Sequence, residues 1–209
     1  MASRTVLALS VASLGAALVL STNDAAAVSI IKDPHPPQYG VEIEPHLDVN
    51  FFTWDNYPGT SYGPGLRVGI PIAGPAFVPK INDSVAISFG ADLVHFEGYT
   101  DNCVNAPGAP CGAAHYEYPG FWALYFPVTL QWNFWLTDKW SVFGEPGLAI
   151  RHSFYPSGYC SDFVGFGCYN ETRLLFAFYV GGRWHFSDRT ALTLRVGYPT
   201  GFSVGLSFF

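Results

Sequence analysis

The chain has 209 residues, with 10 basic and 16 acidic side chains and a formal charge of −6. Its length predicts one domain. Charged residues make up 12% of the sequence and apolar residues 49%, whereas an ordinary soluble domain is roughly 25% charged. This balance excludes intrinsic disorder, which needs low hydrophobicity and high charge. The sequence has no Lys/Arg cluster that could neutralise phosphates, so we expect no nucleic-acid partner.

Aromatic residues are unusually abundant. The sequence has 6 Trp, 12 Tyr and 18 Phe, none of them before Tyr39, together with 22 Gly and 16 Pro. Aromatic side chains favour strands, and good helix formers such as Lys are scarce. The composition therefore predicts an all-β chain.

The N-terminal residues 1–27 have the pattern of a cleaved secretory signal peptide. Arg4 precedes an apolar stretch over 5–20, a polar segment follows at 21–24, and Ala25-Ala26-Ala27 supplies the small-residue cleavage pattern. An uncleaved membrane helix is the alternative, but the apolar run is shorter than the roughly 20 residues that a span needs. Residues 28–38 are rich in proline and are expected to form an extended tail.

Apolar and polar residues alternate in eight later segments, as in strands with one apolar and one polar face. In the first, Val41, Ile43 and Leu47 alternate with Glu42 and Glu44. Several segments reach the roughly 9–11 residues of a tilted membrane strand. The eight predicted strands are 40–53, 64–73, 84–96, 120–136, 140–153, 171–186, 190–198 and 201–209.

The charged residues of these segments all fall on the polar face. A barrel of about eight strands is just wide enough for side chains to fill, and buried charges must be paired. We therefore expect an internal ion-pair network that plugs the barrel, with a gated pore or ligand pocket as the alternative. The predicted network comprises Glu42, Glu44, Asp48, Arg67, Asp92, Glu145, Arg151, Glu171, Arg173, Arg183 and Arg195.

Two architectures fit this alternation: a soluble barrel or sandwich with its apolar face inside, and an outer-membrane barrel with its apolar face toward lipid. The outer-membrane barrel is favoured because a soluble barrel would need many Lys and Glu residues on its exposed strand face. None of Lys32, Lys80 and Lys139 lies in a strand. Short turns on one side and long loops on the other are also typical of it, and both termini would then be periplasmic. Aromatic residues crowd the strand ends, as in interfacial girdles: Phe51, Phe52, Trp54, Phe134, Trp135, Trp140, Trp184 and Phe186.

Over residues 39–209 the chain resembles the small eight-stranded outer-membrane barrels typified by the OmpX protein and the OmpA transmembrane domain. The C-terminal strand is similar to the aromatic-terminated signal that the barrel-assembly machinery reads. Its alternating apolar set ends at Phe208 rather than at Phe209. The resemblance implies an antiparallel up-and-down transmembrane barrel, located as a monomer in the outer membrane among lipids and lipopolysaccharide.

Four cysteines lie in the two long predicted loops, and each loop holds a pair separated by seven residues. An even number of cysteines in an exported chain favours disulfides. Of three connectivities we favour Cys103–Cys111 and Cys160–Cys168, which would brace the extracellular loops. A zinc site built from all four thiolates is the alternative, although the close spacing of zinc motifs is missing.

Two function classes remain. One is a non-enzymatic surface barrel whose aromatic loops contact partners, and for it we expect no metal and no cofactor. The other is a lipid A-modifying enzyme, either a deacylase or an acyltransferase. The segment Arg151-His152-Ser153-Phe154 is similar to a deacylase motif, but it places His152 and Ser153 on opposite strand faces, and a base and nucleophile must share one.

Overall fold

The structure is a computed structural model that describes residues 40–51, 60–74, 82–101, 116–118, 120–155 and 170–209. The predicted signal peptide (1–27), the Pro-rich tail (28–38) and all four cysteines lie outside the described residues. So do Phe52 and Trp54 of the predicted aromatic girdle.

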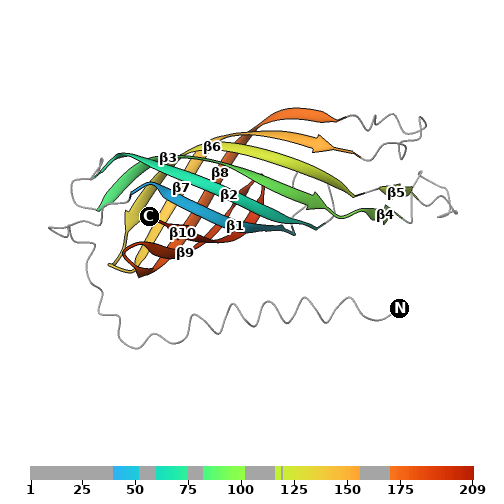
Figure 1. The fold of residues 1–209 in the computed structure, drawn as a ribbon. Helices are drawn as coiled ribbons and strands as arrows, with labels where there is room; N and C mark the ends of the chain where they lie inside the picture. The colour runs from blue at the N-terminus through green and yellow to red at the C-terminus, as the bar shows by residue number, and fades with distance from the viewer. Residues whose placement is uncertain (1–39, 52–59, 75–81, 102–115, 119, 156–169) are drawn as a thin grey trace, which may run out of the picture.

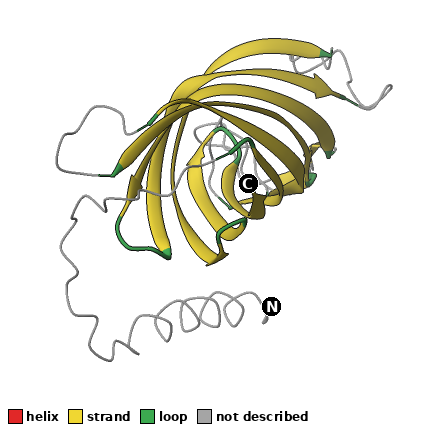
Figure 2. Ribbon diagram, turned by 60° about the vertical axis from the view of Figure 1, so that its left-hand side comes forward, coloured by secondary structure: helices red, strands yellow, loops and turns green. Residues whose placement is uncertain are grey.

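Eight strands form one closed antiparallel barrel, which confirms the predicted up-and-down fold (Figures 1 and 2). Each barrel strand pairs with the one before and after it in the chain, and the last strand closes on the first. The strands are β1 (Glu42–Asn50), β2 (Ser61–Ala73), β3 (Asp83–Phe96), β6 (Phe121–Trp135), β7 (Trp140–Phe154), β8 (Glu171–Ser187), β9 (Thr190–Tyr198) and β10 (Gly201–Phe208).

Two short strands that the periodicity does not predict lie outside the barrel. β4 (Tyr99–Asp101) and β5 (Tyr116–Tyr118) pair with each other and extend the hairpin of β3 and β6 (Figure 1). The sequence predicts a loop in this region, because three residues are too few for a visible alternation. Tyr and Thr nevertheless favour strands.

The start of β2 also differs from the prediction. The strand begins at Ser61, whereas the sequence predicts a start at residue 64. The prediction begins later because Gly63 and Pro64 suggest a turn when the sequence is read alone. In the barrel, Gly63 lies so close to the Leu93 carbonyl oxygen of β3 that a Cβ atom would clash with that backbone. Glycine at this position therefore allows close strand pairing.

The side chains are distributed in the reverse of a soluble protein. On the outer surface, Leu47 is 58% exposed and Phe176 is 61% exposed, whereas Glu44 and Arg183 inside are 1% and 0% exposed. Every barrel strand carries exposed apolar side chains on its outward face. The inward-facing apolar core of a soluble barrel is thereby excluded, and the arrangement matches a barrel that spans a bilayer.

Aromatic rings border this apolar surface at both ends of the barrel. At one end His95 packs between Tyr62 and Trp122, and near the other Trp132 packs on Phe134. Trp122 and Trp132 are ten residues apart on β6, which at about 3.3 Å per residue and 35–45° tilt is roughly 23–27 Å along the barrel axis. That height matches the apolar band of about 25 Å in outer-membrane barrels.

Trp135, which the sequence analysis assigns to the girdle, faces the interior instead. It is buried, and its ring lies 4.5 Å from that of His185. The strand alternation explains the difference, because Trp135 has the opposite parity to Trp132 and Phe134.

The two ends of the barrel differ. The tight connections 136–139 and 188–189 lie at the end where β10 finishes, and the Phe209 amide there donates to the Arg189 carbonyl (3.0 Å). The β4–β5 hairpin extends from the other end (Figure 1). The first and last barrel strands therefore begin and end on the side of the short turns. None of the described residues forms a helix long and apolar enough to cross a membrane.

A charge placed in the middle of the apolar surface should destabilise the barrel in lipid. Val128 lies midway along β6 and is 56% exposed, so Val128→Arg is expected to cost about 2–4 kcal/mol in phospholipid vesicles. Leu136→Arg, beyond the end of β6, is the matched control and should cost about 0–1 kcal/mol. Urea unfolding followed by tryptophan fluorescence measures both, and equal losses would contradict a lipid-facing surface.

Candidate functional site

The interior of the barrel is a chain of polar contacts that runs along its axis. We call the half near the short turns the lower part and the half near the β4–β5 hairpin the upper part. In the lower part the contacts join side chains from β1 and from β6 to β10, and in the upper part they join side chains from β1, β2 and β3. Because strand alternation sends every second residue inward, the charged residues of neighbouring strands meet here.

Arg183 of β8 organises the lower part. Its Nε and Nη2 donate to Oε1 and Oε2 of Glu42 on β1 at 3.0 and 2.7 Å, and its Nη1 donates to Oδ1 of Asn133 (2.6 Å). All three side chains are buried. This bidentate guanidinium–carboxylate pair is among the strongest ion-pair geometries that side chains form.

Arg195 of β9 lies next along the axis and bridges two carboxylates. Its Nη1 and Nη2 donate to Oε1 and Oε2 of Glu44 at 2.6 and 3.0 Å, and Nη2 also lies 3.2 Å from Oε1 of Glu145 on β7. Gln131 donates to the same Glu145 oxygen (2.6 Å) and accepts a bond from Asn133 (3.2 Å). The Arg183 and Arg195 groups are thus parts of one connected network.

Phe143 of β7 is the aromatic member of this interior. Its ring faces inward, with the Arg183 guanidinium carbon 4.3 Å and that of Arg195 5.2 Å from the ring centre. The face of the ring stabilises both cations. It also fills the space that polar side chains leave between them.

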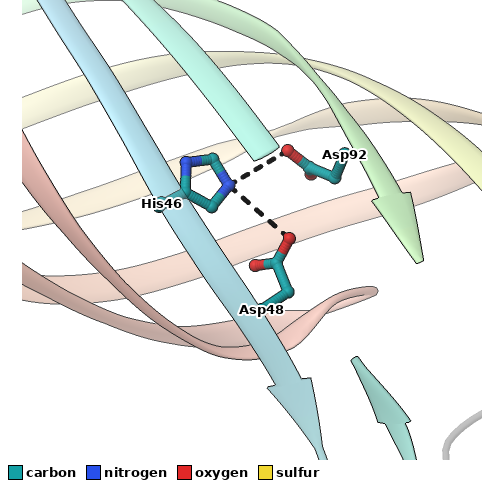
Figure 3. A group of neighbouring side chains, drawn as sticks. All are labelled: His46, Asp48 and Asp92. Carbon is teal, nitrogen blue, oxygen red and sulfur yellow. Dashed lines mark hydrogen bonds and ion pairs between the residues drawn. The ribbon is translucent and has the colours of Figure 1, made fainter. Parts of the chain in front are cut away.

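The upper part is built around Asp92 of β3. Nη2 of Arg67 on β2 donates to Oδ2 of Asp92 (2.8 Å), and Nε2 of His46 lies 3.1 Å from Oδ1 (Figure 3). Asp48 also points toward His46, with Oδ2 3.5 Å from Nε2 (Figure 3). The Arg67 guanidinium in turn lies over the Tyr179 ring at 5.0 Å.

Gly65 of β2 makes the meeting of His46 and Asp92 possible. It pairs with His46 on one side and with Asp92 on the other. A Cβ atom at Gly65 would clash with His46 Nε2 and lie 2.6 Å from Asp92 Oδ1. The missing side chain therefore leaves the space in which residues two strands apart come into contact.

The structure places nine of the eleven predicted network residues in the buried interior. Glu42, Glu44, Asp48, Arg67, Asp92, Glu145, Arg151, Arg183 and Arg195 are each at most 6% exposed. Glu171 and Arg173 differ from the prediction: they pair with each other at 2.6 Å, and their side chains are 41% and 53% exposed.

Glu171 and Arg173 lie outside the network because β8 is longer than β9. Pairing of β8 with β9 reaches Phe178, whereas pairing with β7 continues to Glu171. Ala177, next to this point, is still buried, whereas Glu171 and Arg173 at the far end of β8 lie beyond the closed ring. Alternation alone could not reveal this, because it does not report where a neighbouring strand ends.

Several interior residues are missing from the predicted set although their parity points to them. His46 lies between Glu44 and Asp48 in the alternation, and Gln131 and Asn133 fall on the polar face of β6. A set limited to Asp, Glu and Arg omits them. Phe143 has the parity of Ser141 and Glu145 on the polar face of β7, but an aromatic side chain in a strand suggests the apolar face.

A cavity of about 10 Å³ beside Glu42, Gln131 and Asn133 has about the volume needed for one water molecule.

The two aromatic residues at the C-terminus point to opposite faces of the barrel. Phe208 is exposed on the outer surface, while the Phe209 ring stacks on His185, with 5.5 Å between the ring centres. The alternating apolar surface therefore ends at Phe208.

The deacylase-like segment does not assemble a nucleophile and base. Ser153 is buried on the inward face of β7, whereas His152 lies on the outward face, where Nδ1 is 2.7 Å from Oγ1 of Thr172. The pair therefore stays apart, as the alternation predicts.

No protein-family model and no curated protein matches the sequence. Among solved structures, the chain is similar to Ail, the attachment invasion locus protein of Yersinia pestis, in complex with the heparin analogue sucrose octasulfate. The identity is 12% and the TM-score 0.45, over 81% of this chain and 99% of Ail. The outer membrane protein Ail in a phospholipid bilayer nanodisc gives 13% identity and a TM-score of 0.40, over 81% and 99% of the two chains.

Breaking the buried network should cost far more than breaking the exposed pair. Arg195→Met leaves Glu44 and Glu145 without their shared cation, and we expect a loss of about 3–5 kcal/mol. The control Arg173→Met removes an arginine that is half exposed, so its effect should be small because solvent screens such pairs. Urea unfolding in detergent micelles measures both, and a loss at Arg195 as small as that at Arg173 would contradict the network.

Proposed function

We propose that this protein is an integral outer-membrane β-barrel that conducts no solutes and presents its upper end to partners outside the cell. The observation that carries the proposal is the combination of an apolar outer surface with a charged, filled interior in a closed barrel. Such a molecule cannot be stable in water with this surface uncovered, because contiguous apolar patches of this size are absent from soluble monomers.

The proposed topology follows from the two ends of the barrel. The proposal has residues 1–27 act as a cleaved export signal and places both termini and the short turns in the periplasm. The long connections, with disulfides Cys103–Cys111 and Cys160–Cys168, then lie outside the cell. Phe208 and Phe209 end the strand that the assembly machinery would read.

A surface-interaction role is supported by the upper edge of β8, which faces away from β7 and pairs with no other strand of the described residues above Phe178. Above Phe178 this strand has β7 on one side, and its pairing with β9 has ended. Edge strands offer main-chain donors and acceptors to an extended segment of another protein. The exposed Glu171–Arg173 pair adds charge beside this edge.

Membrane location and sidedness can be tested in one experiment. In Gram-negative cells the protein should fractionate with the outer membrane and run faster on a gel when unboiled. Arg173→Cys should react with an impermeant maleimide on intact cells, whereas Asp188→Cys, in a short turn, should react only after the membrane is opened. The wild-type chain measures the background from native cysteines, and the reverse labelling pattern would contradict the topology.

The closed interior predicts negligible conductance. Reconstituted in planar bilayers, the wild-type barrel should show no stable current steps, because the ion-pair network and Phe143 fill the lumen. A general porin reconstituted in the same way is the positive control. Regular current steps from the wild-type protein would favour the narrow pore over a plugged barrel.

A further inference from the structure

His46 is oriented by a contact that determines which ring nitrogen carries its proton. Nδ1 lies 3.2 Å from the backbone carbonyl oxygen of Glu44, and a carbonyl oxygen only accepts hydrogen bonds, so Nδ1 carries the hydrogen. Nε2 then points at carboxylate oxygens of Asp92 and Asp48, at 3.1 and 3.5 Å (Figure 3). A bare Nε2 lone pair would repel both anions, so either a proton or a metal ion must lie between the three groups.

The charge of the interior also calls for a cation. Among the described inward-facing buried residues, five carboxylates oppose four guanidinium groups, which leaves one negative charge in excess. These residues are Glu42, Glu44, Asp48, Asp92 and Glu145, and Arg67, Arg151, Arg183 and Arg195. A proton in this cluster would balance this charge, whereas a divalent metal ion would change it from one negative to one positive charge.

Asp48 distinguishes the two. A proton on Nε2 serves one acceptor, and Asp92 at 3.1 Å takes it. Asp48 is 1% exposed, and neither of its carboxylate oxygens has a hydrogen-bond partner among the described residues. A buried carboxylate without such partners is costly. A metal ion differs from a proton because it binds all three groups at once.

The geometry of the cluster suits a small divalent ion. The donor atoms of His46, Asp48 and Asp92 all lie within 4.8 Å of one another, and Nε2 is 3.1 and 3.5 Å from the two carboxylates. Ligands bonded at 2.0–2.2 Å in a tetrahedron are about 3.3 Å apart. The two distances from Nε2 match this value, and the two carboxylate oxygens, which lie within 4.8 Å of each other, would move closer on binding. The surrounding contacts are those of metal ligands: Nδ1 donates to a carbonyl, and Arg67 holds the second Asp92 oxygen at 2.8 Å.

We propose that His46, Asp48 and Asp92 bind a divalent first-row transition-metal ion such as Zn²⁺ inside the upper part of the barrel. One imidazole and two carboxylates are a donor set that suits zinc and its neighbours in the row. The ion would connect β1 to β3 across Gly65 of β2. This site is separate from the proposed surface function and does not depend on the location of the barrel.

Zinc uptake by the refolded protein tests the proposal. The full chain, with its cysteines alkylated, is refolded from urea into detergent micelles with ZnCl₂, so that the ion need not enter a closed barrel. After gel filtration the wild type should retain one zinc ion per chain by mass spectrometry. Asp48→Asn should lower the affinity at least about tenfold, as loss of a supporting group already does. His152→Gln, which removes an imidazole outside the lumen, should bind as the wild type does.

A second measurement identifies the ligands. With CoCl₂ in place of ZnCl₂, the wild type should show the visible absorption of a low-symmetry Co²⁺ site, and Asp48→Asn should lack it. The gel shift on boiling verifies that each variant is folded. A folded wild type that retains no zinc would overturn the proposal, as would Asp48→Asn binding like the wild type. If Asp48→Asn does not fold, Asp48→Glu replaces it, and its Co²⁺ spectrum should shift from that of the wild type.

Discussion

The pairing of buried guanidinium and carboxylate groups is the interaction on which the barrel depends. Arg183 with Glu42, and Arg195 with Glu44 and Glu145, place full charges where each side chain is 8% exposed or less. Charges removed from solvent are tolerated only when other charges and hydrogen bonds replace water. The closed ring of strands supplies those partners from opposite walls, so barrel closure and ion pairing require each other.

This interior explains why the outer surface can be so apolar. In a soluble protein the apolar side chains fill the core and the charges lie outside, but here the lumen is already filled by arginine, glutamate, aspartate and Phe143. The apolar face of each strand then has no protein to pack against. Its height, bordered by Trp122 and Trp132, suits the hydrocarbon of a membrane.

The two halves of the lumen differ in how their charges are satisfied. In the lower half, every carboxylate named in the network has a guanidinium partner with short contacts. In the upper half, Arg67 holds Asp92, while neither carboxylate oxygen of Asp48 has a hydrogen-bond partner within the part of the chain that the structure describes. The lower half therefore has the character of a structural plug, and the upper half that of a site for a cation. The upper edge of β8, which has no partner strand on its β9 side among the described residues, lies near that same end.

By itself, the sequence determined the eight barrel strands and their inward and outward faces, because a period of two carries both and charged residues avoid the apolar phase throughout. The closed membrane barrel followed from composition, from the lengths of the connections and from the resemblance to known barrels. The sequence placed nine of the eleven charged residues correctly in the lumen. Only the tertiary structure decided which charges meet, because Glu42 and Arg183 are far apart in the sequence and their contact depends on the register of every strand between them. It also decided that Glu171 and Arg173 lie above the ring, where β9 ends. Only the tertiary structure showed that His46 and Asp92 meet over Gly65. Alternation gives the face on which a residue lies, but not its position along the barrel axis relative to the residues of other strands.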